Sequence, residues 1–292
     1  MTRSISVLLA QLDPPPHDVG ANLETACRLV DKHPEASLAV FPELFLQAYA
    51  PKNVEPIDVD AAEGPIAVLR ACARRRGTAI VVGLAEMTAA GMANTALCVD
   101  ERGQIAARYR KVHLFDGERR VFLAGDEYVT ADMCGMTVAP LICYDIEFPE
   151  APRAVAHAGA QLLVTIAANM DPYADDHALF IRCRALENGL PHVYVNCVGE
   201  RGNFRFCGGS AVIDASGHVL AQLPAYEPAL VVAEVPTAER RTPDYLADRR
   251  PDVAVRTLAP LREGTEPTEP TGPTEPTEPM LLSAAVSKAP RR

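Results

Sequence analysis

The stretch Val138-Ala-Pro-Leu-Ile-Cys-Tyr-Asp-Ile-Glu-Phe-Pro-Glu150 joins a short apolar run to an acidic segment punctuated by proline. An apolar run that ends so abruptly predicts a buried strand that stops at the edge of a sheet. In open α/β sheets, ligands bind in the crevice beyond the carboxyl ends of the strands. Cys143 is the first residue past the run, where a thiol could act as a nucleophile. Taken alone, it could equally be a packed core residue.

Strand-like and helix-like segments alternate on both sides of this stretch. The predicted helices are Ala21–Lys32, Ile66–Arg76, Pro149–His157 and Asp176–Asn188. The predicted strands are Ile5–Gln11, Leu38–Phe41, Thr78–Leu84, Leu162–Ile166 and Val193–Cys197, with hairpins at Thr95–Val99/Ile105–Tyr109 and Ser210–Asp214/Val219–Leu223. Several of these strands are apolar on both faces. This pattern predicts a layered α/β fold whose sheets are covered on both sides.

Composition suits a globular protein with a large core. The chain has 292 residues, of which 48% are hydrophobic, so residues 1–262 can form one domain. The formal charge of −10 argues against a nucleic-acid partner, and no apolar run is long enough to suggest a membrane span. Residues 263–292 differ, because Thr-Glu-Pro units recur between Glu263 and Pro279, and we expect a disordered tail there.

The chain contains eight cysteines, none of them in a Cys-x-x-Cys pair or in a zinc-type pattern with histidine. The N-terminal residues run straight into a predicted strand without an apolar signal segment. We therefore expect free thiols and a cytoplasmic location, with no metal and no other cofactor.

Two other reactive side chains stand just past apolar strands. Glu43 follows the strand Leu38–Phe41, and Lys111 follows the strand that begins at Ile105. Strand ends of one sheet can meet at a single crevice, so both side chains can join Cys143 there. A carboxylate, an ammonium group and a thiol together would form a site for covalent acyl transfer.

Two other interpretations of these residues remain open. Glu43 and Lys111 could form a surface ion pair beside a structural Cys143. Alternatively, a histidine could serve as the base for the thiol, the candidates being His113, His157, His177 and His192. Cys143 lacks the flanking glycines of a sharp nucleophile elbow, which weakens this second alternative. His113 fits better as a support for the segment that carries Lys111.

Three motifs carry a resemblance to a known family. Phe41-Pro-Glu-Leu44, Tyr109-Arg-Lys-Val-His-Leu-Phe115 and Leu141-Ile-Cys-Tyr-Asp-Ile-Glu-Phe-Pro-Glu150 are similar to the signatures of the nitrilase superfamily of carbon–nitrogen hydrolases. The resemblance extends from about Ile5 to Arg250 and includes Arg184-Ala-Leu-Glu-Asn188 and Gly208-Gly-Ser-Ala-Val-Ile-Asp214. One tract departs from the family pattern, because Ala48 replaces a glycine before Tyr49.

The resemblance implies an α-β-β-α sandwich with two central mixed sheets covered by helices, assembled as a homodimer or a larger homo-oligomer. It also implies a catalytic triad of Glu43, Lys111 and Cys143, with Glu118 as a second glutamate nearby. The backbone N–H of Tyr144 would help to stabilise the oxyanion. Tyr49, Asn169, Met170 and Tyr173 are the candidate substrate-binding residues.

The residues after the cysteine favour one branch of this superfamily. Nitrilases resemble Cys-Trp-Glu, whereas this chain reads Cys143-Tyr-Asp-Ile-Glu147, which favours an amidase that releases ammonia from a small carboxamide. Asn169-Met-Asp-Pro-Tyr173 and Asp244-Tyr-Leu-Ala-Asp-Arg-Arg250 look most like amidases that include stereoselective amino-acid-amide hydrolases. An N-carbamoyl amidohydrolase, an ω-amidase, a nitrilase and a non-catalytic interaction module remain as alternatives.

Overall fold

A computed structural model describes residues 4–49, 54–237 and 243–253. The chain divides into a compact unit that ends at Arg249 and a second unit that begins at Arg250. In the second unit residues 250–253 are described, and Arg250 forms an ion pair with Asp252 at 2.8 Å. The predicted domain end at residue 262 and the predicted tail 263–292 lie outside the described residues.

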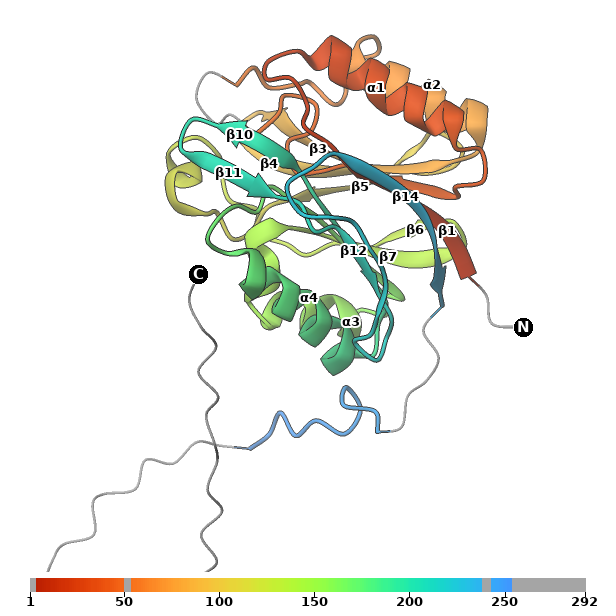
Figure 1. The fold of residues 1–292 in the computed structure, drawn as a ribbon, viewed down its shortest axis with the longest axis vertical. Helices are drawn as coiled ribbons and strands as arrows, with labels where there is room; N and C mark the ends of the chain where they lie inside the picture. Colours follow the sequence, from red (N-terminus) through yellow and green to blue (C-terminus); the bar gives the residue numbers. More distant parts are fainter. Residues whose placement is uncertain (1–3, 50–53, 238–242, 254–292) are drawn as a thin grey trace, which may run out of the picture. The chain divides into compact units, whose positions relative to one another are not determined.

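Two six-stranded mixed sheets form the centre of the first unit (Figure 1). In spatial order, the first sheet consists of β14 (Ala229–Pro236), β1 (Ser4–Gln11), β2 (Leu38–Val40), β3 (Ala79–Thr88), β4 (Gly91–Val99) and β5 (Ile105–Arg110). The second consists of β13 (Val219–Gln222), β12 (Ala211–Ile213), β9 (His192–Asn196), β8 (Leu162–Ala167), β7 (Met136–Ile142) and β6 (Ala131–Met133). Each sheet has three parallel strands at its centre and antiparallel strands beside them.

Helices cover the outer face of each sheet, as Figure 1 shows. The first sheet carries α1 (Val19–Lys32) and α2 (Pro65–Arg76), and the second carries α3 (Glu150–His157) and α4 (Ala174–Asn188). This arrangement confirms the predicted α-β-β-α sandwich. Two 3-10 helices, η1 (Asp116–Arg120) and η2 (Cys143–Glu147), and a hairpin of β10 (Val198–Arg201) and β11 (Phe204–Cys207) complete the described elements.

The alternation of side chains along β1 shows how the layers pack. Val7 and Leu9 point into the core between the two sheets, whereas Leu8 and Ala10 pack under the helices of the first sheet. Successive residues of a strand face opposite sides, so a strand buried on both faces must be apolar throughout. The continuous apolar runs in the sequence reflect this double burial.

Helix α1 shows the local signals that begin and orient a helix. Asp18 precedes it, and its side chain accepts a hydrogen bond from the N–H of Ala21 at 2.9 Å. Ala26, Leu29 and Val30 then fall on one face and are buried against the sheet. Every helix and strand predicted above is present within a few residues. Within the described ranges, no helix has both the length and the apolarity needed to cross a bilayer.

Candidate active site

The sheet topology brings Glu43 and Lys111 to one edge. β2 is parallel to β3, and β5 follows β3 through two antiparallel pairings, so β2 and β5 run in the same direction. Glu43 comes three residues after the last residue of β2, and Lys111 comes directly after β5. In the second sheet, Cys143 comes directly after β7. All three side chains therefore start from carboxyl ends of strands, as the sequence predicts.

Gly83 in β3 makes room for the turn that carries Glu43. The carbonyl of Pro42 accepts the N–H of Gly83 at 3.1 Å, and the carbonyl of Gly83 accepts the N–H of Leu46 at 3.1 Å. A Cβ at position 83 would lie 2.6 Å from the Cα of Glu43 and closer still to neighbouring backbone atoms. Only glycine lets the strand approach this turn so closely.

Lys111 is buried between two carboxylates. Its Nζ lies 2.7 Å from Oε1 of Glu43 and 2.8 Å from Oε2 of Glu118. Asn94 Nδ2 donates to Glu43 at 2.7 Å, and the hydroxyl of Tyr49 donates to Glu118 at 3.0 Å. Buried charges need partners of this kind, because an unpaired one is costly to remove from water. The cluster thus fixes the cation and both carboxylates in one geometry.

Burial and charge set the protonation of the reactive groups. Burial raises the pKa of Glu43, with the Lys111 ammonium opposing the change. Burial would lower the pKa of Lys111, but Glu118 and Glu43 outweigh it, so that pKa lies well above its usual value. Burial and the charge of Glu43 raise the pKa of the Cys143 thiol well above its usual value. The resting site therefore holds a cationic lysine beside a protonated thiol.

Cys143 is the first residue of η2 and forms a strained turn directly after β7. Its φ angle is +45°, in the left-handed region that disfavours a residue with a Cβ. The buried carboxylate of Asp145 supports the turn, accepting the N–H of Ile142 at 3.0 Å and the hydroxyl of Tyr109 at 2.7 Å. It also accepts the backbone N–H of His113 at 3.0 Å, which ties the turn to the segment after Lys111. The missing glycines thus do not prevent a sharp turn.

The predicted substrate-binding residues gather around the thiol. Cys143 is 8% exposed and faces a narrow pocket of about 20 Å³, which is room for about one water molecule. Lys111 is part of its wall, together with five predicted residues: Tyr49, Tyr144, Asn169, Met170 and Tyr173. Glu43 and Glu118 are not part of this wall, but both contact Lys111, at 2.7 and 2.8 Å.

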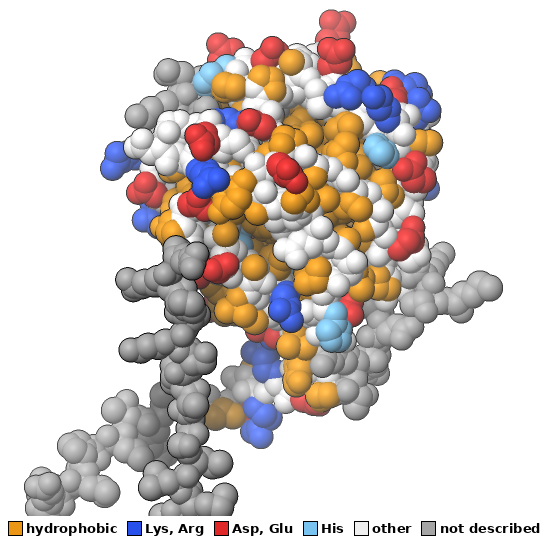
Figure 2. All heavy atoms as spheres, in the orientation of Figure 1, with side chains coloured by type: hydrophobic (Ala, Val, Ile, Leu, Met, Phe, Trp, Pro, Cys, Tyr) orange, Lys and Arg blue, Asp and Glu red, His pale blue; other side chains and the backbone are white. Residues whose placement is uncertain are grey.

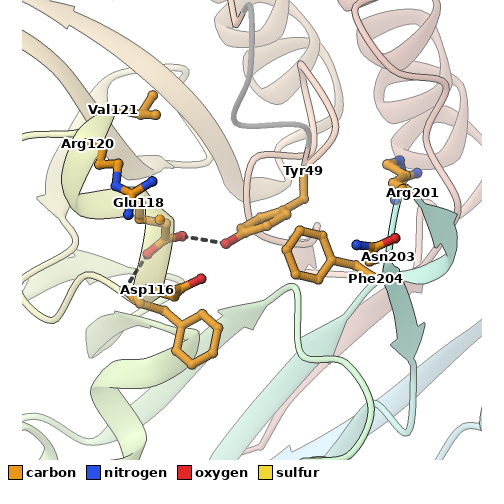
Figure 3. Close-up of a pocket in the computed structure, with 11 residues that line it drawn as sticks. Tyr49, Asp116, Glu118, Arg120, Val121, Arg201, Asn203 and Phe204 are labelled. Carbon is orange, nitrogen blue, oxygen red and sulfur yellow. Dashed lines mark hydrogen bonds between the residues drawn. The ribbon is translucent and has the colours of Figure 1, made fainter.

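A larger cavity adjoins this pocket. It measures about 680 Å³ and lies between η1 and the β10–β11 hairpin (Figure 3). Tyr49 and Phe115 belong to the walls of both cavities. Figure 3 shows Tyr49 between Glu118 and Phe204, and the rings of Tyr49 and Phe204 meet edge to face at 6.2 Å. Tyr49 and Phe115 therefore lie where the two cavities meet.

The four candidate histidines bond to groups other than Cys143. His113 bonds to Asp145 at 2.9 Å, and exposed His157 bonds to Arg249 at 3.2 Å. His192 bonds to Thr165 and to the carbonyl of Ile181, and its burial lowers its pKa to about 4. His177 lies in the pocket wall, but Tyr194 and Glu147 occupy its two ring nitrogens. The geometry does not favour a cysteine–histidine pair.

Two buried residues of the site had no clear signal in the sequence. Asn94 lies within β4 and bonds to Glu43, and Asp145 follows β7 closely but bonds to the backbone of His113, so the role of each depends on a segment distant in the chain. Within the described residues, no group of three or more His, Cys, Asp or Glu side chains could hold a metal ion. All eight cysteines are free thiols.

The chain belongs to the carbon–nitrogen hydrolase family, which it matches over residues 7–243. An (R)-stereoselective amidase from a Pseudomonas species is 38% identical over 225 residues, which cover 74% of this chain and 80% of the relative. The hydrolase in the pqqF 5′ region of Pseudomonas protegens is 36% identical over 261 residues, which cover 86% of this chain and 91% of the relative.

Solved structures agree with this assignment. An amidase from Nesterenkonia sp. superposes with a TM-score of 0.76 at 32% identity, covering 84% of this chain and 93% of that one. A mutant of the Nesterenkonia sp. AN1 amidase carries the acetamide moiety of fluoroacetamide on its active-site cysteine. These matches confirm the resemblance to the amidase branch of the nitrilase superfamily. They also confirm the predicted class of activity, hydrolysis of non-peptide carbon–nitrogen bonds by a cysteine-dependent amidase.

Proposed function

We propose that Glu43, Lys111 and Cys143 form the catalytic triad of an amidase that hydrolyses small carboxamides to acid and ammonia. The observation that carries this proposal is the contact of Lys111 with Glu43 at 2.7 Å, because Lys111 and Cys143 line the same narrow pocket. A base, a cation and a thiol placed in this way supply the three groups that acyl transfer requires.

The first stage forms a thioester. Glu43 takes the thiol proton as the sulfur of Cys143 attacks the amide carbon, which is necessary because the raised pKa keeps the resting thiol protonated. Lys111 and the backbone N–H of Tyr144 stabilise the oxyanion. The carbon–nitrogen bond then breaks, and the proton on Glu43 passes to the nitrogen, so that ammonia leaves.

The second stage releases the acid. Glu43, again ionised, takes a proton from water while the water oxygen attacks the thioester carbon. The second oxyanion uses the same donors as the first and collapses with cleavage of the carbon–sulfur bond. The proton on Glu43 returns to the sulfur of Cys143. Glu118 positions Lys111 through the 2.8 Å contact, and its bond from Tyr49 holds it beside the pocket.

A substrate panel tests the proposal. It should contain neutral amides, both enantiomers of amino-acid amides, N-carbamoyl amino acids, ω-amides and nitriles, each scored for ammonia release. We expect turnover of small carboxamides above that of nitriles. Preferential conversion of a nitrile to its acid would identify a nitrilase instead. No turnover of any compound, with no adduct on Cys143, would favour a non-catalytic interaction module.

We also propose that the protein forms a homo-oligomer in the cytoplasm. The free thiols suit a reducing compartment. On the face shown in Figure 2, hydrophobic side chains are interspersed with charged ones. Leu179, on α4, is 61% exposed. Light scattering coupled to size exclusion should give at least twice the 31.4 kDa of one chain. A single-chain mass at micromolar concentration would contradict the oligomer.

A further inference from the structure

Glu147 is a carboxylate in the pocket wall that the proposed mechanism does not use. It is the last residue of η2, the short helix that Cys143 begins, and it faces the same pocket as the thiol. Its side chain is 28% exposed, whereas those of Glu43 and Glu118 are almost completely buried. Among these three carboxylates, Glu147 is thus the one most open to a ligand.

The position of Glu147 is held from both sides of its backbone. Arg184 on α4 donates to the carbonyl of Ile146 at 2.8 Å and to that of Glu147 at 3.0 Å. The guanidinium group is occupied by these carbonyls and by Glu187 at 2.9 Å, so it does not neutralise the Glu147 carboxylate directly. The end of η2 is therefore fixed while its carboxylate remains available.

His177 and Tyr194 orient the carboxylate. His177 Nε2 lies 3.3 Å from Oε1 of Glu147, and its Nδ1 lies 2.9 Å from the hydroxyl of Tyr194. Burial raises the pKa of Tyr194 well above its usual value, so the phenol keeps its proton. In a neutral imidazole, Nδ1 accepts the Tyr194 hydroxyl and Nε2–H donates to Glu147. These hydrogen bonds use Oε1 of Glu147 and leave Oε2 available to accept a hydrogen bond from a ligand.

The charges around the pocket favour a cation. Among the described residues of its wall, Lys111 is the sole lysine or arginine, and it lies against both Glu43 and Glu118. Those three groups carry one excess negative charge when both carboxylates are ionised, and Glu147 adds another. A substrate carboxylate near Glu147 would meet like charge, whereas an ammonium group would gain a charge-assisted hydrogen bond.

The spacing along η2 limits where such an ammonium group lies. A 3-10 helix rises about 2 Å per residue, so the Cα atoms of Cys143 and Glu147 are separated by about 8 Å along the helix axis. Both side chains reach into the same pocket and shorten that gap. One or two carbon atoms between the scissile carbonyl and the ammonium nitrogen suit this spacing.

We propose that Glu147 determines specificity by binding the ammonium group of substrates that are α- or β-amino amides. This inference rests on the proposed amidase function and adds a residue and a substrate charge to it. This specificity disfavours ω-amides, which carry a carboxylate on the acyl side of the cleaved bond. It also disfavours N-carbamoyl amino acids, which carry a carboxylate on the amine side, close to that bond.

Isosteric pairs of amides test this proposal on the full-length protein. β-Alaninamide and butyramide have the same number of heavy atoms, as do glycinamide and propionamide, but only the first of each pair carries an ammonium group. We expect the unaltered enzyme to have a higher kcat/KM for the charged member of at least one pair. Equal or lower values for the charged members of both pairs would overturn the proposal without any variant.

Glu147→Gln keeps the shape of the side chain and removes its charge. We expect kcat/KM for the preferred amino amide to fall about 10–100-fold, mainly through KM, because a hydrogen bond to a charged group is lost. The neutral partner should change less than about threefold, on the scale of ordinary surface substitutions. Equal losses for both members would show a structural role for Glu147 and overturn the proposal.

Glu150→Gln is the matched control, because Glu150 is exposed at the start of α3 and outside the pocket wall. It makes the same change of net charge and should leave the preference intact. Loss of preference in this control would assign the effect to the overall field and contradict a local site. Turnover of neutral amides without cation preference would refute this inference alone, whereas no turnover of any amide would refute the proposed function.

Discussion

The Nζ of Lys111 lies 2.7 Å from Oε1 of Glu43, and both side chains are at most 1% exposed. The proposed base and the proposed oxyanion donor therefore touch one another before any substrate binds. Each stabilises the charged form of the other, which offsets part of the cost of burial. This contact makes the function of either group dependent on the other.

Lys111→Ala should lower kcat by about 10²–10³-fold, the usual effect of removing an oxyanion donor. The variant should still fold, because Glu43 and Glu118 can take up a proton when the cation is gone. Steady-state ammonia release and circular dichroism check both parts. Lys32→Ala, at an exposed position in the last turn of α1, is the control and should keep full activity. Near-normal kcat in Lys111→Ala would exclude the assigned role.

The raised pKa of Glu43 predicts the acid side of the pH profile. Only the ionised carboxylate can take the thiol proton, so kcat/KM falls as pH drops through this pKa. Because burial raises that pKa, the midpoint should lie above the usual 4.5 of a glutamate. Asn94 lowers the pKa by donating to Glu43, so Asn94→Leu should move the midpoint further up. A midpoint at or below 4.5, or a downward move in this variant, would count against Glu43 as the base.

Gly83→Ala should damage the site through the backbone. The added Cβ would lie 2.6 Å from the Cα of Glu43, so the turn that carries the base must move. Crowding of this kind costs about 1–3 kcal/mol of stability. We expect kcat to fall at least about tenfold, because small misplacements of a reacting group are costly. Gly20→Ala in α1 is the control, since its Cβ would have no neighbour closer than 3.6 Å.

Asp145→Asn tests the support of the cysteine turn. The carboxylate accepts bonds from Ile142, Tyr109 and His113, whereas an amide has one oxygen and would turn an NH₂ group toward some of these donors. Each donor left without an acceptor costs about 1–3 kcal/mol. Urea unfolding should show this loss, and the exposed Asp126→Asn should not. Unchanged stability in Asp145→Asn would contradict this description of the turn.

Apolar runs in the sequence predict the strand ends that carry Glu43, Lys111 and Cys143, because burial on both faces leaves a local pattern. Asn94 leaves no such pattern, since its bonds to Glu118 and Glu43 join segments 24 and 51 residues apart. Asp145 stands near the same strand end as Cys143, but its bonds to His113 and Tyr109 reach 32 and 36 residues along the chain. β14 was not predicted for a similar reason. It is a half-exposed strand that pairs with β1, more than 200 residues away in the sequence. The hydrogen bond from Ser6 to Glu234, for example, joins residues 228 positions apart.

The positive φ of Cys143 was also beyond the sequence pattern. No glycine flanks the residue, and a sharp turn was therefore not expected. Cys143 adopts the positive φ without a glycine, and hydrogen bonds to the Asp145 side chain, such as that from the N–H of Ile142, stabilise the turn. The binding role of Glu147 has no signal in the sequence for a different reason. A carboxylate four residues past a thiol has no assigned direction until η2 turns it into the pocket.

The most direct test of the triad is mass spectrometry of the protein quenched during turnover of an amide. We expect a mass increase equal to the acyl group less the hydrogen it replaces on the thiol, located on the peptide that contains Cys143. Cys143→Ala should show neither this increase nor amide hydrolysis. An acyl group on one of the other seven cysteines, or a Cys143→Ala variant that retains most of its activity, would contradict the account.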